Sequence, residues 1–347
     1  MNTKLLDFRS DTVTQPTEAM RSAMASAIVG DDTMGEDPTV RRLEAMSAEL
    51  LGKEAALFVI SGTMANQVAI MALTQLGDEI IAGENSHLYN FEAGGVAALS
   101  GAQIRPMRAE AGMFNPAAVR KSIRPKGIQS AVSRVLCLEN TYDLTRGIPV
   151  GLEYHQEMAE IAHRHDMVLY LDGARIFNAA LSQGLSVKAL CAPIDCLQFC
   201  LSKGLAAPVG ALLVGSKAFI DRARWIRQRI GGGMRQAGHM AAAGIVALEQ
   251  MTGRLAEDHE NATRLANGLA AIDERLIDRV TPRTNIVRID FGTAGYQPEP
   301  IVKALLEQQI KIRQLDQESC RMITHWGIDA DDIESVLAVF SSLLKRK

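Results

Sequence analysis

The chain of 347 residues is 47% hydrophobic and 22% charged. This composition excludes a disordered protein, and the length allows a large and a small domain. A net charge of −3 provides no basic surface for nucleic acid or an anionic membrane. No apolar stretch has the length of a membrane span and the N-terminus has no apolar signal core, so we expect a cytoplasmic protein that binds no membrane.

The first forty residues are rich in turn formers around one predicted helix at residues 18–26. Such a segment buries little surface by itself, so we expect it to lie across another part of the protein or another subunit. Residues 39–51 follow as an amphipathic helix, because Val40, Leu43 and Leu50 recur at helical spacing.

Short apolar runs then alternate with helical segments. Strands are predicted at residues 55–60, 79–82, 103–107, 134–138, 167–171, 197–201 and 211–214, with helices at 62–75, 91–98, 116–123 and 152–165. Strands that alternate with helices form parallel sheets with helices on both faces. We therefore predict an α/β fold with a mostly parallel sheet.

The C-terminal third predicts a smaller α/β unit. A long helix at 238–271 leads to a strand at 285–291, a helix at 299–309, strands at 311–314 and 321–324, and a closing helix at 331–345. We expect an N-terminal segment at 1–15 that packs near the active site, a large domain at 16–250 and a small domain at 251–347.

The five cysteines are odd in number and lack the paired spacing of a zinc site. They lie mostly in apolar runs, so we expect reduced core thiols in a reducing compartment and no metal site.

Polar residues stand directly after four of the predicted strands. They are Ser61-Gly62-Thr63, Glu139-Asn140-Thr141, Asp172-Gly173-Ala174-Arg175 and Ser202-Lys203. In open sheets of this kind, ligands bind beyond the carboxyl ends of the strands. We therefore expect these groups to converge on one rim of the sheet.

Lys203 is the residue on which the interpretation of this rim depends. It ends an apolar run at the edge of a buried strand, where desolvation can activate an amine as a nucleophile. Lys203 is therefore a candidate to form a Schiff base with pyridoxal 5′-phosphate. The alternative is a solvated lysine just past a strand, and only the surrounding residues can decide between the two.

The other parts of such a cofactor site also have candidates. Ser61-Gly62-Thr63 offers the N–H groups of a helix N-terminus to a phosphate, and Asp172 offers a carboxylate to the protonated pyridine nitrogen. His87 is a planar residue that could cover the ring, and Arg175 and Arg321 could bind a substrate carboxylate. Taken singly, these residues could be helix caps, a core histidine and surface ion-pair partners. Their joint occurrence favours the cofactor site.

Longer motifs strengthen this interpretation. They are Phe8-Arg9-Ser10-Asp11-Thr12-Val13-Thr14, Gly35-Glu36-Asp37-Pro38, Ser61-Gly62-Thr63-Met64, Cys137-Leu138-Glu139-Asn140-Thr141, Leu171-Asp172-Gly173-Ala174-Arg175, Cys200-Leu201-Ser202-Lys203-Gly204 and residues 231–236. Along nearly its whole length the chain resembles the low-specificity L-threonine aldolases. The resemblance implies the aspartate-aminotransferase-like fold (fold type I) of pyridoxal phosphate enzymes. It also implies a homotetramer built from dimers, with each active site at a subunit interface.

The resemblance assigns roles to the cofactor-binding residues by position. Lys203 matches the Schiff-base lysine of the family, Asp172 matches the partner of the pyridinium, and His87 matches the histidine that stacks on the ring. Gly62 and Thr63 match phosphate-binding positions.

Substrate-binding residues are assigned in the same way. Ser10, Arg175 and Arg321 match residues that hold the substrate carboxylate, and Arg175 also borders the cofactor. Arg235, in the glycine-rich stretch, is expected to reach a cofactor phosphate, either in its own subunit or across the subunit interface.

Three positions depart from the family pattern. The family usually has a histidine near the substrate β-hydroxyl where this chain has Tyr142, and commonly a tyrosine where this chain has Met34. We expect both positions to affect the choice of substrate, and Tyr142 to take part in catalysis. Ala206 stands where glycine is usual, a change expected to affect only packing.

The resemblance implies retro-aldol cleavage of a β-hydroxy-α-amino acid, of the L-threonine or L-allo-threonine type, to glycine and an aldehyde. One alternative keeps the cofactor but leads to β-elimination or racemisation, or uses another β-hydroxy-amino acid. Another alternative is a non-catalytic protein that retains the fold for binding or assembly.

Overall fold

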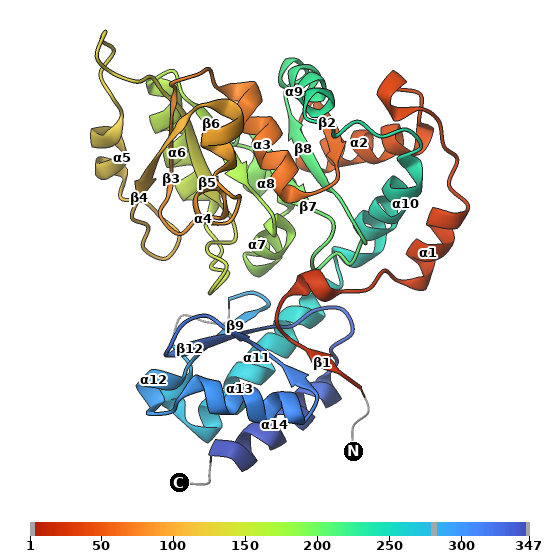
Figure 1. Ribbon diagram of the computed structural model, residues 1–347, viewed down its shortest axis with the longest axis vertical. Coiled ribbons are helices and arrows are strands. Elements are labelled where there is room, and N and C mark those ends of the chain that lie inside the picture. The colour runs from red at the N-terminus through yellow and green to blue at the C-terminus, as the bar shows by residue number, and fades with distance from the viewer. Residues whose placement is uncertain (1–3, 279–282, 345–347) are drawn as a thin grey trace.

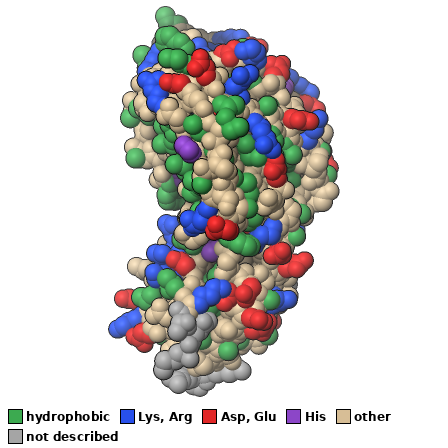
Figure 2. Space-filling model, turned by 90° about the vertical axis from the view of Figure 1, so that its right-hand side faces the viewer, with side chains coloured by type: hydrophobic (Ala, Val, Ile, Leu, Met, Phe, Trp, Pro, Cys, Tyr) green, Lys and Arg blue, Asp and Glu red, His purple; other side chains and the backbone are tan. Residues whose placement is uncertain are grey.

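The computed structural model describes residues 4–278 and 283–344. Figure 1 shows a larger part built around a central sheet and a smaller part that carries both ends of the chain. The two parts meet at a narrower waist, and on the face in Figure 2 basic and acidic side chains are interspersed. In the described ranges, no helix combines the length and the apolar character needed to cross a membrane.

The central sheet has seven strands in the order β2-β8-β7-β6-β5-β3-β4. Their bounds are β2 (Ala55–Val59), β3 (Glu79–Gly83), β4 (Gln103–Met107), β5 (Ser133–Glu139), β6 (Val168–Asp172), β7 (Cys196–Cys200) and β8 (Ala211–Gly215). The pairs from β7 through β6, β5 and β3 to β4 are parallel, and β8 is antiparallel to both of its neighbours. The predicted mostly parallel α/β sheet is confirmed.

Helices cover both faces of this sheet because its buried strands alternate their apolar side chains between the faces. Phe58 faces one core cluster with helices α2 (Pro38–Leu51) and α6 (Leu152–Arg164), whereas its neighbour Leu57 faces the other. That second cluster contains residues of helices α3 (Gly62–Leu73) and α9 (Lys217–Arg229).

Further helices complete the large part. They are α1 (Glu18–Ala25), α4 (His87–Asn90), α5 (Pro116–Ser122), α7 (Ile176–Ser182), α8 (Val187–Cys191) and α10 (Gly238–Val246). The sequence did not predict α7, α8 or α9. In α9 the signal was an apolar stripe of Ile220, Ala223 and Ile226 among many charges.

Two predicted helices differ in detail. In place of a helix at 91–98, the chain forms α4 and a π-helical stretch, Val96–Ser100, because Ala93 and Gly94 adopt positive φ angles between them. The long predicted helix at 238–271 is α10, a π-helical stretch at Ala247–Met251, a short turn and α11 (Leu255–Ile272).

The smaller part contains a three-stranded antiparallel sheet in the order β11-β12-β9 and a two-stranded sheet of β1 and β10. The bounds are β1 (Leu6–Asp7), β9 (Ile286–Asp290), α12 (Phe291–Ala294), α13 (Pro298–Glu307), β10 (Ile310–Lys311), β11 (Arg313–Gln314), β12 (Ser319–Ile323) and α14 (Ala330–Leu344). The strand predicted at 311–314 is thus split in two, and Lys345 of the predicted closing helix lies outside the described residues.

The N-terminal segment joins the smaller part before it enters the larger one. Leu6 and Phe8 belong to the same buried cluster as Leu265 and Phe340, and β1 pairs in parallel with β10. The segment therefore connects the two parts next to the waist, and the domain limits at 15 and 250 stay predictions.

Candidate active site

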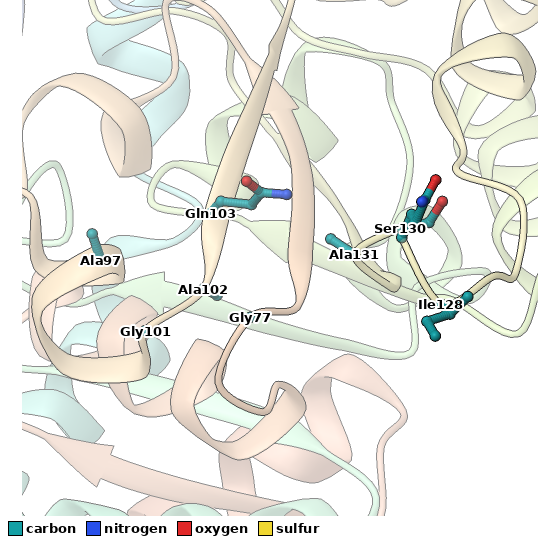
Figure 3. Close-up of a pocket in the computed structure, with 9 residues that line it drawn as sticks. Gly77, Ala97, Gly101, Ala102, Gln103, Ile128, Ser130 and Ala131 are labelled. Atoms are coloured by element: carbon teal, nitrogen blue, oxygen red, sulfur yellow. The ribbon is translucent and has the colours of Figure 1, made fainter.

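The four polar segments predicted to converge do meet in one cavity, at the carboxyl ends of β5, β6 and β7. The lining residues are Gly62, Thr63, Asn66, His87, Glu139, Thr141, Leu144, Asp172, Ala174, Arg175, Gln198, Cys200, Ser202 and Lys203. A wider hollow lies at the opposite ends of the strands, beside the first residues of β3 and β4 (Figure 3). Gly77, Ala97, Gln103, Ile128 and other residues without titratable side chains line it. This wider hollow therefore offers no titratable group for chemistry, in contrast to the first cavity.

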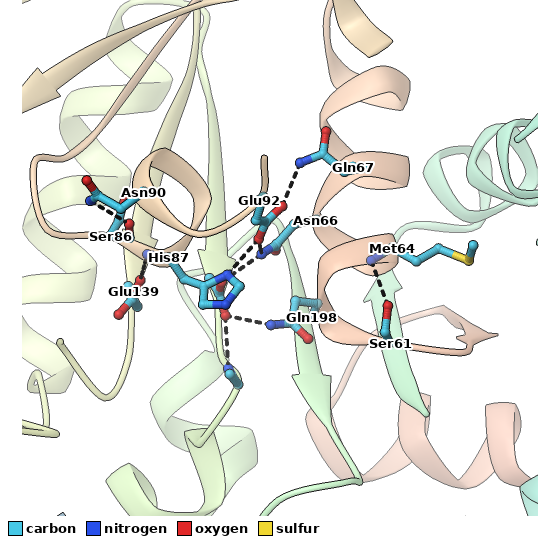
Figure 4. Close-up of polar contacts among 12 residues, drawn as sticks. Ser61, Met64, Asn66, Gln67, Ser86, His87, Asn90, Glu92, Glu139 and Gln198 are labelled. Atoms are coloured by element: carbon cyan, nitrogen blue, oxygen red, sulfur yellow. Dashed lines mark hydrogen bonds and ion pairs between the residues drawn. The ribbon is translucent and has the colours of Figure 1, made fainter. Parts of the chain in front are cut away.

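The first turn of α3 faces the cavity. Ser61 caps the helix, because its Oγ accepts a hydrogen bond from the Met64 N–H at 3.1 Å (Figure 4). A Cβ atom on Gly62 would lie 2.7 Å from the Cys200 Sγ, so a side chain there would require Cys200 to move. The N–H groups at the start of α3 thus remain available to an anion.

Asp172 ends β6 and is held from three directions. Its Oδ1 accepts from the Gln198 side chain at 2.5 Å and from the Ala174 N–H at 3.1 Å, and its Oδ2 accepts from Asn66 at 2.8 Å. These donors fix a buried carboxylate at the base of the cavity. That is the environment needed to pair with a protonated ring nitrogen.

Lys203 lies in the turn after β7, at the edge of the same cavity. Its carbonyl accepts from the Thr14 hydroxyl at 3.0 Å and from the Ala206 N–H at 2.8 Å, so the backbone of the lysine is fixed. Ala206 itself is buried with a φ of 61°. This left-handed conformation costs alanine more than glycine, so the change at this position affects backbone strain and not only packing.

Two arginines and the N-terminal segment meet beside the cavity. Arg175 donates from Nη2 and Nε to the Asp11 carboxylate at 2.5 and 2.7 Å. Burial opposes ionisation of Asp11, but Arg175 and Lys203 outweigh it and hold the pKa of that carboxyl below its ordinary value. Arg321 donates to the Arg9 carbonyl at 2.9 Å and to the Leu144 carbonyl.

Arg321 is buried and is not among the residues that line the cavity, so its role toward the substrate stays a prediction. Its described polar contacts are to backbone carbonyls rather than to a carboxylate. Its Nε has no partner among the described residues. Burial, with Arg175 and Arg313 nearby, lowers the pKa of Arg321 to about 10. A buried guanidinium without an anion is unfavourable, so this geometry suits an anionic ligand.

Glu139, at the end of β5, lines the cavity beside Asp172. One of its oxygens accepts from the His87 backbone N–H at 2.7 Å. Burial and the neighbouring Asp172 raise the pKa of Glu139 well above its ordinary value. The cavity thus contains a carboxyl that holds its proton to higher pH than a solvated glutamate.

The structure places Tyr142 in the core and not among the residues that line the cavity, so the part in catalysis expected of it stays a prediction. Its side chain is 4% exposed and packs against Gly83 and Gly112. Its hydroxyl accepts from the Asn85 N–H at 3.3 Å, and burial raises its pKa. The preceding Thr141 faces the cavity instead, with a buried hydroxyl that has no partner among the described residues.

Met34, Arg235 and Ser10 are not among the residues that line the cavity within this single chain. Met34 is 71% exposed, and Arg235 pairs with Asp31 at 3.0 Å on the surface. Ser10 lies between Arg9 and Asp11, the residues that contact the two arginines, and caps a short helical turn. The roles assigned to these three residues stay predictions.

The sequence alone did not single out several residues that support the site. They are Asp11, Asn66, Glu92, Glu139 as an ionisable group, and Gln198. Gln198 and Asn66 could have been singled out from the sequence, because each is a polar residue inside an apolar run and such a residue indicates a buried polar group.

Taken together, these groups fit pyridoxal phosphate. The cavity combines a lysine, a buried carboxylate with fixed donors, a planar histidine and a helix N-terminus whose first residue, Gly62, has no room for a side chain. Each part matches one charge or surface of that cofactor.

Replacement of Glu139 by glutamine tests its burial. The folded protein binds the Glu139 proton at pH values where the unfolded chain has lost it, so wild-type stability falls as pH rises above about 4.5. We expect the free energy of unfolding of the cofactor-free protein, measured by urea denaturation, to fall with pH more steeply in wild type than in Glu139→Gln. The difference between the two slopes should be up to about 1.4 kcal/mol per pH unit. Equal slopes for the two proteins would contradict the assignment.

Removal of the Tyr142 hydroxyl tests its place in the core. Tyr142→Phe should keep amino-acid turnover within about twofold and lower the free energy of unfolding by about 1 kcal/mol, because the Asn85 N–H loses its acceptor. Tyr154→Phe is the matched control, since that buried hydroxyl also accepts from a backbone N–H. A loss of turnover in Tyr142→Phe, but not in Tyr154→Phe, would indicate that the Tyr142 hydroxyl takes part in catalysis.

Comparison with known proteins identifies the family of the chain. The sequence profile of the beta-eliminating lyase family matches residues 7–291. A probable low-specificity L-threonine aldolase 2 from Arabidopsis thaliana is 41% identical over 98% of this chain and 97% of its own length. The low specificity L-threonine aldolase of Escherichia coli K12 is 41% identical over 99% of this chain and 100% of its own length.

The fold also has a solved counterpart. A threonine aldolase from Leishmania major superposes with a TM-score of 0.84 over 98% of this chain and 99% of that one, at 18% identity. With the profile and the relatives above, the conclusion is that this chain belongs to the beta-eliminating lyase family, among the low-specificity L-threonine aldolases.

Proposed function

We propose that the protein is a pyridoxal phosphate-dependent aldehyde-lyase that cleaves a β-hydroxy-α-amino acid of the L-threonine type to glycine and an aldehyde. The observation that carries the proposal is the convergence of Lys203, Asp172 and the first turn of α3 on one cavity. The names of the relatives at about 40% identity support the same substrate class.

The cofactor supplies an electron sink for the electron pair released at Cα of the substrate. Lys203 would hold the cofactor through its amine, and Asp172 would pair with its ring nitrogen. The N-terminus of α3, at Gly62 and Thr63, would bind its phosphate. These roles follow the chemistry of each group and its position in the cavity.

The substrate carboxylate is bound by Arg321, with Arg175 and Ser10 beside it. Arg321 is suited to this role because it is buried without a carboxylate partner among the described residues. Arg175 is already paired with Asp11, so it contributes a fixed positive field and a wall of the cavity. Holding the carboxylate orients the bond between Cα and Cβ for cleavage.

His87 accepts the proton of the substrate β-hydroxyl. It lines the cavity and carries an imidazole, whereas Tyr142 lies in the core. As the O–H bond breaks, its electron pair becomes the second bond of the aldehyde carbonyl, and the electron pair between Cα and Cβ stays on Cα. Cα later takes up a proton and glycine leaves.

We also propose that the protein is a homotetramer built from dimers, in which Arg235 and Met34 of one subunit reach the cavity of the other. Support comes from their joint exposure on one surface. Thr33 donates to the Met234 carbonyl at 3.0 Å, which places the loop of Met34 beside Arg235. A cytoplasmic location is proposed with it, because all five cysteines are buried free thiols.

Lys203→Ala should abolish both aldehyde release from L-threonine and the visible absorbance of the lysine-bound cofactor, because the attachment atom is gone. Both are measured on cofactor-loaded protein, with the surface variant Lys217→Ala as control. Cleavage at the wild-type rate in Lys203→Ala would overturn the assignment. Pyruvate and ammonia from L-serine, or loss of optical activity without cleavage, would indicate β-elimination or racemisation instead.

Mixing two inactive variants tests the proposed interface. If Arg235 acts in the neighbouring subunit, a Lys203→Ala subunit supplies Arg235 to an Arg235→Ala subunit that retains Lys203. Random mixing should then restore about a quarter of wild-type turnover, because half of the dimers are hybrids with one complete site of two. Recovery is measured after the mixed variants are denatured and refolded together. No recovery would place Arg235 in its own subunit's site, and an Arg235→Ala variant that is active by itself would place Arg235 outside both sites.

A further inference from the structure

Glu92 is a buried carboxylate next to the cavity that has no part in the chemistry described so far. It follows α4, and its side chain is 0% exposed. Three side chains point hydrogen-bonding atoms at it: Asn66 at 2.6 Å, Gln67 at 2.5 Å and His87 Nδ1 at 2.9 Å. Figure 4 shows Glu92 between these groups, on the side of His87 that faces α3.

The contact with Glu92 determines which ring nitrogen of His87 carries hydrogen. A carboxylate oxygen only accepts, so Nδ1 must donate to it, and neutral His87 therefore has its hydrogen on Nδ1. Nε2 is then an acceptor, and no described residue hydrogen-bonds to it. This is the form of the imidazole that can take a proton from a substrate in the cavity.

Glu92 is also linked to Asp172 through one amide group. Asn66 Nδ2 donates to Glu92 at 2.6 Å and to Asp172 at 2.8 Å, and Asn66 Oδ1 accepts from the Tyr170 hydroxyl at 2.6 Å. Because Tyr170 holds the oxygen side of the amide, both hydrogens of its nitrogen remain for the carboxylates. The groups proposed to contact opposite parts of the cofactor, His87 and Asp172, are thus oriented by one buried network.

We propose that Glu92 is a positioning residue, which holds His87 in the Nδ1–H tautomer over the cofactor and stabilises its ring when Nε2 accepts the substrate proton. This inference rests on the proposed function, since it gives the proton acceptor its orientation. A negative charge behind an imidazole both fixes the tautomer and favours the protonated ring. Glu92 does not line the cavity, so it acts through His87.

A bound cation is the competing use of these residues. Oxygen or nitrogen atoms of His87, Glu92 and Asp172 lie within 4.8 Å of one another. However, the amide nitrogens of Asn66, Gln67 and Gln198 all donate to the two carboxylates. Donor hydrogens directed at the same oxygens oppose a cation there, so we argue for the histidine role.

Two replacements of Glu92 separate its charge from its acceptor atoms. In Glu92→Gln the amide oxygen can still accept from His87, and the new NH₂ group can be satisfied if Gln67 turns over, because Gln67 Oε1 has no partner among the described residues. Glu92→Ala removes every acceptor. We therefore expect the glutamine variant to keep the tautomer and lose the charge, and the alanine variant to lose both.

The tautomer is read from ¹⁵N chemical shifts of His87 in cofactor-loaded protein labelled at histidine, with the signal assigned by its absence in His87→Asn. Glu92→Gln should keep the wild-type shifts but lower kcat about tenfold, with KM unchanged. Glu92→Ala should shift hydrogen towards Nε2 and lower kcat about a hundredfold. Glu44→Gln is the matched control, since Glu44 is also a buried glutamate with a backbone and an arginine partner.

Wild-type shifts and wild-type kcat per bound cofactor in Glu92→Ala would overturn the proposal. If that variant does not fold, wild-type kcat in Glu92→Gln overturns the role of the charge. Loss of the wild-type His87 shifts on addition of Mg²⁺ or Mn²⁺ to the holoenzyme would favour the cation site instead. If wild-type protein fails to cleave L-threonine, the proposed function fails, whereas the ¹⁵N comparison still decides whether Glu92 sets the His87 tautomer.

Discussion

The site depends on the way buried carboxylates are held by neutral amides. Asp172 and Glu92 are both buried, and neither has a lysine or arginine as its hydrogen-bond partner among the described contacts. Asn66, Gln67 and Gln198 instead supply N–H donors from α3 and β7. Such donors solvate a negative charge without neutralising it, so Asp172 keeps its full charge for a cationic ring nitrogen. An arginine at the same place would have compensated Asp172 and weakened that pairing.

The N-terminal segment has the complementary task of arranging the positive charges. Leu6 and Phe8 anchor it in the core of the smaller part, and directly after Phe8 the residues Arg9 and Asp11 contact Arg321 and Arg175. Asp11 pairs with Arg175, whereas the described hydrogen bonds of Arg321 are donated to backbone carbonyls. Among the described residues, Arg321 therefore has no carboxylate as a hydrogen-bond partner, and a carboxylate ligand can supply one. Because the same segment is packed in the smaller part, the position of that part is coupled to the geometry of the arginines.

The predicted and unpredicted features divide by the range of the interactions that produce them. The strands and the residues that follow them were predictable, because apolar runs and turn residues are local signals and the carboxyl ends of parallel strands share one edge. Lys203, Asp172 and Gly62 were found in this way.

Side-chain direction within the loop after β5 was not predictable, and the turn there places Thr141 in the cavity and Tyr142 in the core. The amide network was missed because Asn66, Glu92 and Gln198 come from segments far apart in the sequence. The roles proposed for Arg235 and Met34 require a second subunit, which no pattern within one chain describes.

The burial of Tyr142 moves the question of substrate choice to Leu144. Leu144, two residues after Tyr142, lines the cavity, and its carbonyl accepts a hydrogen bond from Arg321. The same residue thus forms part of the wall and orients the arginine proposed to bind the substrate carboxylate. A change of backbone position at Leu144 would move the wall and the arginine together, so the space left for the substrate β-substituent and the orientation of its carboxylate are not independent. Tyr142 acts on both through the backbone, because its N–H and carbonyl pair with Ile148 and its buried ring fixes the start of the loop. A substitution at Tyr142 would therefore change specificity through the loop, without contact with the substrate.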